Sequence, residues 1–171
     1  MVTPEALARD HAPRVFGFAR MLCNNVADSE DLAQEALLKA MRNIHRFDPT
    51  RGSLDTWLWS IVLNVARDAG RASTRAETLW ERMVSGHLSE TQADEVEVLA
   101  LRRLSDAELL EEVNRLPRRY RSLIALRFGG DLRYEEIAQL LHENPAALRQ
   151  AMRRALKALR IRLEERNEPD A

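Results

Sequence analysis

Apolar residues recur at helical spacing in three segments of the first 72 residues. The first segment follows Thr3-Pro4, a capping residue and a proline that suit a helix start, and Asn24-Asn25 ends it. Asp28 is the candidate cap of the second segment and Ser53 that of the third. The apolar stripes are Leu7, His11, Val15, Phe18 and Leu22; Leu32, Ala36, Leu37, Ala40, Met41 and Ile44; and Leu54, Trp57, Leu58, Ile61, Val62, Val65, Ala66 and Ala69. Because three amphipathic helices can close a small core, residues 1–72 are predicted to form one helical domain.

The helical pattern weakens in residues 73–105, which are rich in acidic side chains. Apolar residues still occur in two short groups, Leu79, Trp80, Met83 and Val84, and Val96, Leu99, Leu101 and Leu104. A stretch with loop character separates the two groups. The segment is therefore interpreted as a partly helical acidic linker between two domains.

A second set of apolar stripes begins near Asp106, with breaks at Pro117 and at Gly129-Gly130. These breaks predict helices that end at each of them. Residues 106–165 are predicted to form the second domain, and residues 166–171 a tail. With six glycines, six prolines and no sustained strand alternation, the fold class is all-α, with two small helical domains.

Residues 134–160 have the proportions of a helix-turn-helix: a short helix, a tight turn and a longer helix that Asn144-Pro145 starts. Small Ala138 allows the two helices to approach closely. The outer face of the longer helix is basic, and its start would read base edges in DNA. The candidate contacts are Ala146, Arg149, Gln150 and Arg153 for bases, with Arg154 and Lys157 beside them. The alternative is the solvated face of a structural helix, and spacing alone leaves both open.

The charge is polarised although the net charge is only −1. Residues 27–38 contain four acids and no base, and residues 145–166 contain seven bases and two acids. This polarity predicts two different partners, one basic and one a polyanion.

Several classes of protein are disfavoured. Cys23 is the only cysteine, so no disulfide framework or cysteine zinc site forms within the chain. The four histidines are scattered, and no phosphate-binding glycine loop is present, so we expect neither an enzyme nor a cofactor. The sequence has no signal-peptide pattern or apolar run of membrane-spanning length, so we expect a cytoplasmic protein without membrane insertion.

Two groups of motifs resemble the bacterial sigma-70 family. In the second half, Leu116-Pro117-Arg118-Arg119-Tyr120-Arg121, Leu126-Arg127-Phe128 and residues 132–138 are similar to sigma region 4. In the first half, residues 31–36 resemble region 2.2 and residues 57–68 resemble regions 2.3 and 2.4. Both modules in this order, at this length, resemble the extracytoplasmic-function (group 4) sigma factors.

The resemblance implies a sigma factor that binds core RNA polymerase and promoter DNA. Region 2.2 of the family docks on the clamp coiled-coil of the largest polymerase subunit, and the matching residues are Asp28, Asp31, Gln34, Glu35, Lys39 and Arg42. The alternative for the acids is complementing the helix dipole, which explains Glu35 less well.

By the same resemblance, the third helix and the loop before it open the minus-ten element, and the last helix reads the minus-thirty-five element. The implied minus-ten residues are Arg51, Gly52, Ser53, Trp59, Asn64, Arg67 and Arg71. Trp59 lies off the apolar stripe, so it suits either base stacking or covering the first helix or the linker. Trp57 lies on the stripe and is expected in the core.

The family also implies an anti-sigma factor clamped between the two domains, and a linker that threads the polymerase's product-exit channel. Glu90, Asp94, Glu95 and Glu97 could imitate nucleic acid there, or simply be solvated. The sequence departs from the family pattern where glycine is usual and His142 stands, where Ser or Thr is usual and Arg133 stands, and at Ala147. Competing functions are a stand-alone helix-turn-helix regulator and a sigma-like decoy that binds an anti-sigma factor.

Overall fold

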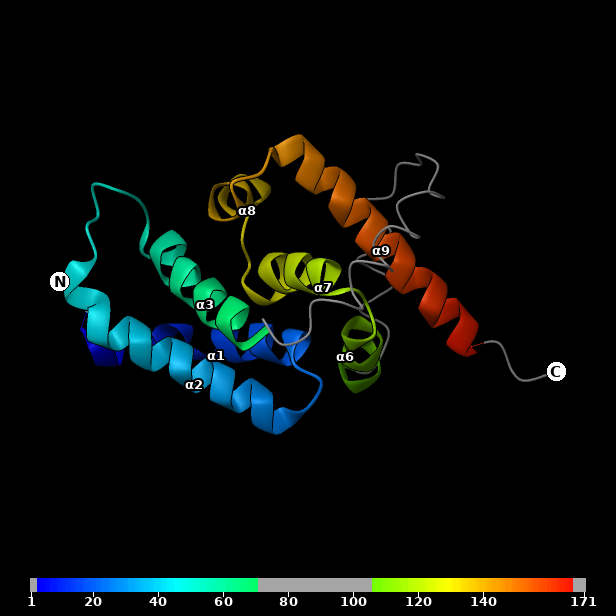
Figure 1. The fold of residues 1–171 in the computed structure, drawn as a ribbon, viewed down its shortest axis with the longest axis horizontal. Coiled ribbons are helices and arrows are strands. Elements are labelled where there is room, and N and C mark those ends of the chain that lie inside the picture. The colour runs from blue at the N-terminus through cyan, green and yellow to red at the C-terminus, as the bar shows by residue number, and fades with distance from the viewer. Residues whose placement is uncertain (1–2, 71–105, 168–171) are drawn as a thin grey trace.

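The computed structural model describes residues 3–70 and 106–167, and in these residues every regular element is a helix (Figure 1). The first half contains α1 (Pro4–Leu22), α2 (Val26–Asn43), the 3-10 turn η1 (Ile44–Arg46) and α3 (Leu54–Gly70). The second half contains α6 (Asp106–Asn114), α7 (Arg118–Ile124), the π-helical turn η2 (Ala125–Gly129), α8 (Tyr134–Leu141) and α9 (Pro145–Asn167). The predicted all-α class is confirmed.

The helices of the first half begin at short polar side chains that accept hydrogen bonds from free backbone N–H groups. Thr3 Oγ1 accepts from the N–H of Ala6 at 3.2 Å, and Ser53 Oγ accepts from the N–H of Thr56 at 3.1 Å, as predicted. The predicted cap at Asp28 is wrong. Asn25 caps α2, since its side-chain oxygen accepts from the N–H of Asp28 at 2.8 Å while its amide donates to the Asp28 carboxylate at 2.7 Å. This reciprocal pair starts the helix three residues earlier.

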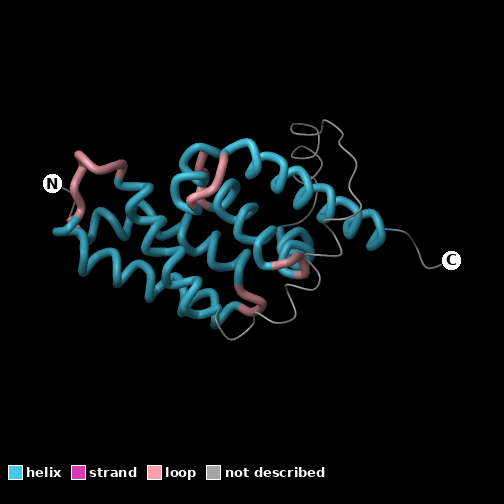
Figure 2. The backbone as a smooth tube through the Cα atoms, turned by 45° about the horizontal axis from the view of Figure 1, so that its top comes forward, coloured by secondary structure: helices cyan, strands magenta, loops and turns pink. Residues whose placement is uncertain are grey.

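In the second half, α9 packs against α6, α7 and α8. Helices α8 and α9 form the predicted helix-turn-helix, whose connecting turn is visible among the loops in Figure 2. His142 ends α8 in the left-handed conformation, with φ 55° and ψ 41°, and Asn144 Oδ1 accepts from the N–H of Ala146 at 2.8 Å. At the start of α8, the N–H of Arg133 donates to the carboxylate of Glu136 at 2.8 Å, and the arginine side chain supplies no acceptor in return.

The two halves lie against each other and share one continuous set of buried apolar residues. Helix α1 contacts α6, α7 and η2, and α3 contacts α8 (Figure 1). Gly129 and Gly130 lie at this junction: a Cβ on Gly129 would lie 3.2 Å from the backbone nitrogen of Phe18, and one on Gly130 would lie 3.0 Å from the indole of Trp59. The glycine pair therefore does more than end a helix, because it lets the second half approach α1 and α3 closely.

Three arginines make polar contacts across the junction. Arg14 on α1 bonds to the carboxylate of Asp55 at 3.1 Å and also donates to the carbonyl oxygen of Gly130. Arg118 donates to the carbonyl oxygen of Ala66, and Arg121 donates to the side-chain oxygen of Asn24 at 3.0 Å. The contacts of Arg14 and Arg118 give hydrogen-bond donors to backbone carbonyl groups of the buried residues Gly130 and Ala66.

The end of the chain differs from the prediction. Helix α9 continues to Asn167, so Arg166 lies on the helix and pairs with acids of α6 rather than belonging to a tail. The linker residues named above, and Arg71, lie outside the described residues. Among the helices described, none is both long enough and apolar enough to cross a membrane.

Candidate nucleic-acid interface

The first half of helix α9 carries the residues predicted to contact DNA on the side opposite its buried residues. On its inner side, Leu148, Met152 and Leu159 are fully buried. On the outer side, Ala146 and Gln150 are exposed, and Arg149, Arg153, Arg154 and Lys157 are half-buried. The six predicted contact residues therefore lie on the side of α9 opposite these buried residues, two of them exposed and four half-buried, because apolar residues recur at helical spacing on the inner side.

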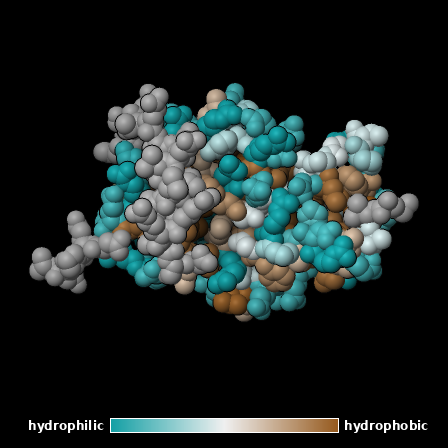
Figure 3. All heavy atoms as spheres, turned by 180° about the vertical axis from the view of Figure 1, so that it is seen from behind, coloured by the Kyte–Doolittle hydropathy of each residue, from teal (hydrophilic) through white to brown (hydrophobic). Residues whose placement is uncertain are grey.

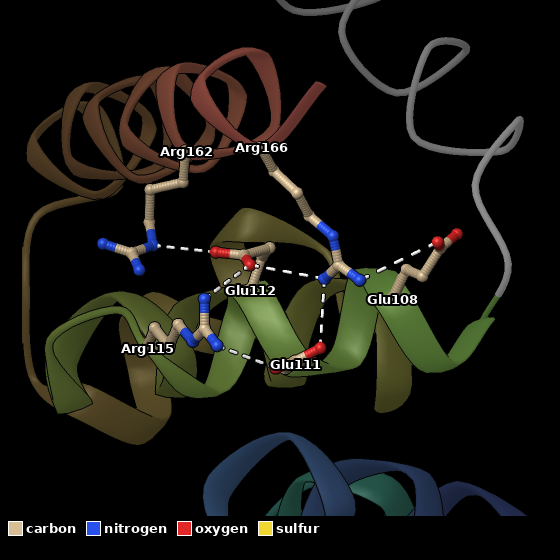
Figure 4. A network of polar contacts seen from close by, with 6 residues as sticks. All are labelled: Glu108, Glu111, Glu112, Arg115, Arg162 and Arg166. Atoms are coloured by element: carbon tan, nitrogen blue, oxygen red, sulfur yellow. Dashed lines mark hydrogen bonds and ion pairs between the residues drawn. The ribbon is translucent and has the colours of Figure 1, made fainter. Parts of the chain in front are cut away.

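A network of ion pairs holds the end of α9 against α6. Glu112 is a buried carboxylate with a side-chain exposure of 2%. It accepts from Arg162 at 3.1 Å, from Arg115 at 3.0 Å and from Arg166 at 3.4 Å (Figure 4). Arg166 also pairs with Glu111 at 3.0 Å, which raises the pKa of its guanidinium. Sequence reasoning missed this network, since Glu112 lies about fifty residues from Arg162 along the chain.

Helix α2 carries a second charged surface, formed by the six residues predicted to bind polymerase. Asp28, Asp31, Gln34, Glu35, Lys39 and Arg42 are all exposed. From Asp31 onward they line a surface hollow of about 570 Å³ together with Leu38 and Asn43. We call the residues Asp31, Gln34, Glu35, Leu38, Lys39 and Arg42 the α2 surface.

Leu38 is a residue of the α2 surface that the sequence analysis missed. It is 49% exposed among charged neighbours. Figure 3 shows that the face seen from behind is mostly hydrophilic, with apolar residues in separate patches. The available signal was an apolar residue outside the stripe of the second helix, because such a residue is expected to be exposed.

The loop before α3 holds Arg51, Gly52 and Ser53 at the surface. Asp48 accepts from the hydroxyl of Thr50 at 2.7 Å and from its N–H at 2.9 Å, and these hydrogen bonds lower the pKa of the Asp48 carboxyl. Gly52 has φ 156°, a conformation that favours glycine. The loop therefore has a defined turn that presents the three predicted contacts to solvent.

Helix α3 does not bring its predicted minus-ten residues to one surface. Asn64 and Arg67 are exposed, but Trp59 is fully buried. The indole of Trp59 packs against Phe18, with ring centroids 5.1 Å apart, and against Gly130. Its N–H has no hydrogen-bond acceptor among the described residues. Trp57 packs against the core as expected, and its ring centroid lies 5.7 Å from that of Phe47.

Residues 7–76 match the profile of sigma-70 region 2, and residues 106–159 match that of sigma-70 region 4. The RNA polymerase sigma factor SigV of Bacillus subtilis (strain 168) is 29% identical over 154 residues, which cover 90% of this chain and 87% of SigV. The ECF RNA polymerase sigma factor RpoE of Cereibacter sphaeroides is also 29% identical over 154 residues, covering 90% and 82%.

Two solved structures share the fold. The sigma factor RpoE from Bartonella quintana, in complex with the anti-sigma factor NepR, matches with a TM-score of 0.67 at 22% identity, covering 92% of this chain and 94% of that chain. CnrH, in complex with the cytosolic domain of CnrY, matches with a TM-score of 0.59 at 22% identity, covering 95% and 88%.

The fold and the two charged surfaces define a two-module helical protein whose second module is a helix-turn-helix. Both modules match sigma-70 regions in their usual order. The chain belongs to the sigma-70 family of transcription factors, in its extracytoplasmic-function (ECF) group.

Proposed function

We propose that this protein binds core RNA polymerase and directs it to specific promoters. The first module binds the polymerase through the α2 surface and melts the minus-ten element, and α9 reads the minus-thirty-five element. The protein itself performs no catalysis in this scheme. It acts where the polymerase is, in the bacterial cytoplasm.

The observation that carries the proposal is the presence, on matching modules of one chain, of an α2 surface that begins with acids and of an α9 outer face that is basic. The α2 surface is acidic at its start, and its carboxylates suit a basic or hydrogen-bonding partner. The outer face of α9 is basic and suits the phosphates and base edges of a DNA groove. A stand-alone helix-turn-helix regulator would leave the α2 surface without a role.

The test is run-off transcription with purified core polymerase and the full-length protein. Glu35→Arg should reduce both polymerase binding and transcript yield, because it places a cation in the α2 surface. Glu30→Arg is the matched control, since Glu30 is exposed on α2 but does not line the hollow. A protein that gives no promoter-specific transcript would be a decoy or a stand-alone regulator. Equal effects of the two substitutions would remove the α2 surface from the scheme.

The proposal includes an anti-sigma factor as a second protein partner. A protein of the same fold, RpoE from Bartonella quintana, was solved in complex with the anti-sigma factor NepR. Addition of the cognate inhibitor should abolish the run-off transcript. An inhibitor that binds the chain and leaves transcription unchanged would argue against this partner.

A further inference from the structure

Arg149, a predicted base contact at the start of α9, is held by two residues of α8. Its Nη2 lies 2.5 Å from the carboxylate of Glu135, and its guanidinium lies 5.3 Å from the ring centroid of Tyr134. The ring of Tyr134 also lies 5.7 Å from the guanidinium of Arg127, which donates to the carbonyl oxygen of Leu132 at 3.3 Å. The side chain of Arg149 thus has a carboxylate and an aromatic ring of α8 as neighbours.

These contacts contribute little to fold stability. The side chains of Arg149 and Glu135 are 42% and 61% exposed, and exposed ion pairs of this kind are weak. Their effect is on the conformation of Arg149, because an arginine side chain has several rotatable bonds and loses less freedom on binding when it is already positioned. A guanidinium has five N–H donors, so donors remain for a guanine edge while one is bonded to Glu135.

The charge of Glu135 points to the same role. A carboxylate on a surface that approaches DNA is repelled by the phosphates and lowers the affinity for any sequence. A surface built only for affinity would carry no acid there. The negative charge instead favours contact with a donor-bearing guanidinium in one orientation, at the expense of general affinity.

We infer that Glu135, supported by Tyr134, is a positioning residue that orients Arg149 for bidentate recognition of guanine in the minus-thirty-five element. This inference rests on the proposed function of α9. In this role Glu135 lowers the affinity for DNA of any sequence and raises the discrimination between bases.

The experiment uses the full-length protein assembled with core polymerase. A preferred minus-thirty-five duplex is first selected from random sequences, and binding is then measured at one salt concentration to that duplex, to duplexes with each guanine replaced, and to random DNA. For a bidentate contact, replacing the recognised guanine should weaken binding by roughly 5- to 150-fold. Arg149→Ala should abolish this discrimination.

Glu135→Ala should reduce the discrimination toward that of Arg149→Ala and strengthen binding to random DNA. In the double variant the loss should equal that of Arg149→Ala alone, because both residues act through one contact.

Glu135→Gln keeps a hydrogen-bonding group and should retain part of the discrimination. Tyr134→Phe keeps the ring and should retain the discrimination. Tyr134→Ala removes the ring and should lower the discrimination. Glu143→Ala is the charge-matched control, since Glu143 pairs with Arg119 at 2.9 Å and not with α9.

Full discrimination in Glu135→Ala, with loss in Arg149→Ala, would overturn the positioning role and leave the proposed function intact. Full discrimination in both variants would overturn the inference by removing Arg149 as the guanine contact. Failure to select any preferred duplex would contradict both the proposed function of α9 and the inference. Equal changes in Glu135→Ala and Glu143→Ala would show that the effect comes from net charge alone. That result would also overturn the inference.

Discussion

Gly130 lies against the indole of Trp59, so closely that a Cβ at this position would lie 3.0 Å from Cζ2 of the ring. Trp59 belongs to α3 in the first module, and Gly130 follows η2 in the second. The same Cβ would lie 2.7 Å from the carbonyl oxygen of Leu126, an atom of the backbone. Glycine at position 130 is therefore a condition of the contact between the modules.

Gly130→Ala should loosen this contact. We expect the free energy of unfolding to fall by about 1–3 kcal/mol, because an added methyl group has no space here. Denaturant unfolding measures the loss, and small-angle scattering should show a larger radius of gyration. Gly17→Ala is the control, since nothing lies within 4 Å of a Cβ there and a helical glycine is replaced. It should stabilise by about 0.5–1 kcal/mol, so equal behaviour of both variants would contradict the packing argument.

Trp59 can contact promoter DNA only when the modules separate, because it is fully buried between them. In a protein with Trp57→Phe and Trp80→Phe, Trp59 can be replaced by 5-hydroxytryptophan and excited apart from the tryptophans of the polymerase. We expect acrylamide to quench this fluorophore more strongly after core polymerase binds. Unchanged quenching would show that Trp59 stays in the core and would remove it from the predicted minus-ten contacts.

His142 ends α8 with a positive φ of 55°, a conformation that costs a residue with a side chain about 1–2 kcal/mol. His142→Gly should therefore raise the free energy of unfolding by about 0.5–1 kcal/mol. Thermal unfolding would detect this as an increase in the midpoint. Gln139→Gly, at an exposed position within α8, should have the opposite sign and cost about 1 kcal/mol. A lower midpoint in both variants would show that His142 makes a favourable contact of its own.

Glu112 should be the most sensitive acid of α6. Glu112→Gln keeps the shape of the side chain but removes the charge that three guanidinium groups share, so we expect a loss of about 1–3 kcal/mol. The change is measured as a lower denaturant midpoint. Glu108→Gln is the control, because Glu108 is half-exposed and lies 3.8 Å from Arg166. Its effect should stay within about 0.5 kcal/mol, and an equal loss in both would refute the special role of the buried carboxylate.

Leu38 tests the α2 surface without altering charge. Leu38→Gln should leave the thermal midpoint nearly unchanged, because half of the side chain is exposed. It should weaken binding to core polymerase by about 1–2 kcal/mol if the leucine is buried in that complex. Val26→Gln is the control, because Val26 is also an exposed apolar residue of α2 but does not line the hollow. Equal affinity of the two variants would exclude Leu38 from the interface.

Much of the fold could be predicted because it depends on residues near one another in the chain. Helical spacing of apolar residues indicated the helices, and Thr3, Ser53 and Asn144 begin helices as predicted. The cap at Asn25 shows the limit of this reasoning, since Asp28 was the predicted cap and the hydrogen bonds between the two residues place the start of α2 at Asn25.

In the candidate surfaces, too, spacing within one helix predicted some residues correctly, and tertiary contacts decided others. The bases predicted to contact DNA recur at helical spacing near the start of α9, so the sequence alone predicted that they would lie on one side of that helix. Trp59 did not follow, because its place off the apolar stripe predicts exposure for α3 alone. Its burial requires Phe18 and Gly130, which come from other elements.

The tertiary structure alone decided the contacts between distant segments. It brought Glu112 to Arg162, Glu135 to Arg149, and Gly130 to Trp59. None of these pairs has a local sequence signal, because contact at long range depends on how whole helices pack and not on the spacing of residues within one helix. The sequence by itself determined the helices and the sign of their outer faces, and packing decided which of those faces remain open to a partner.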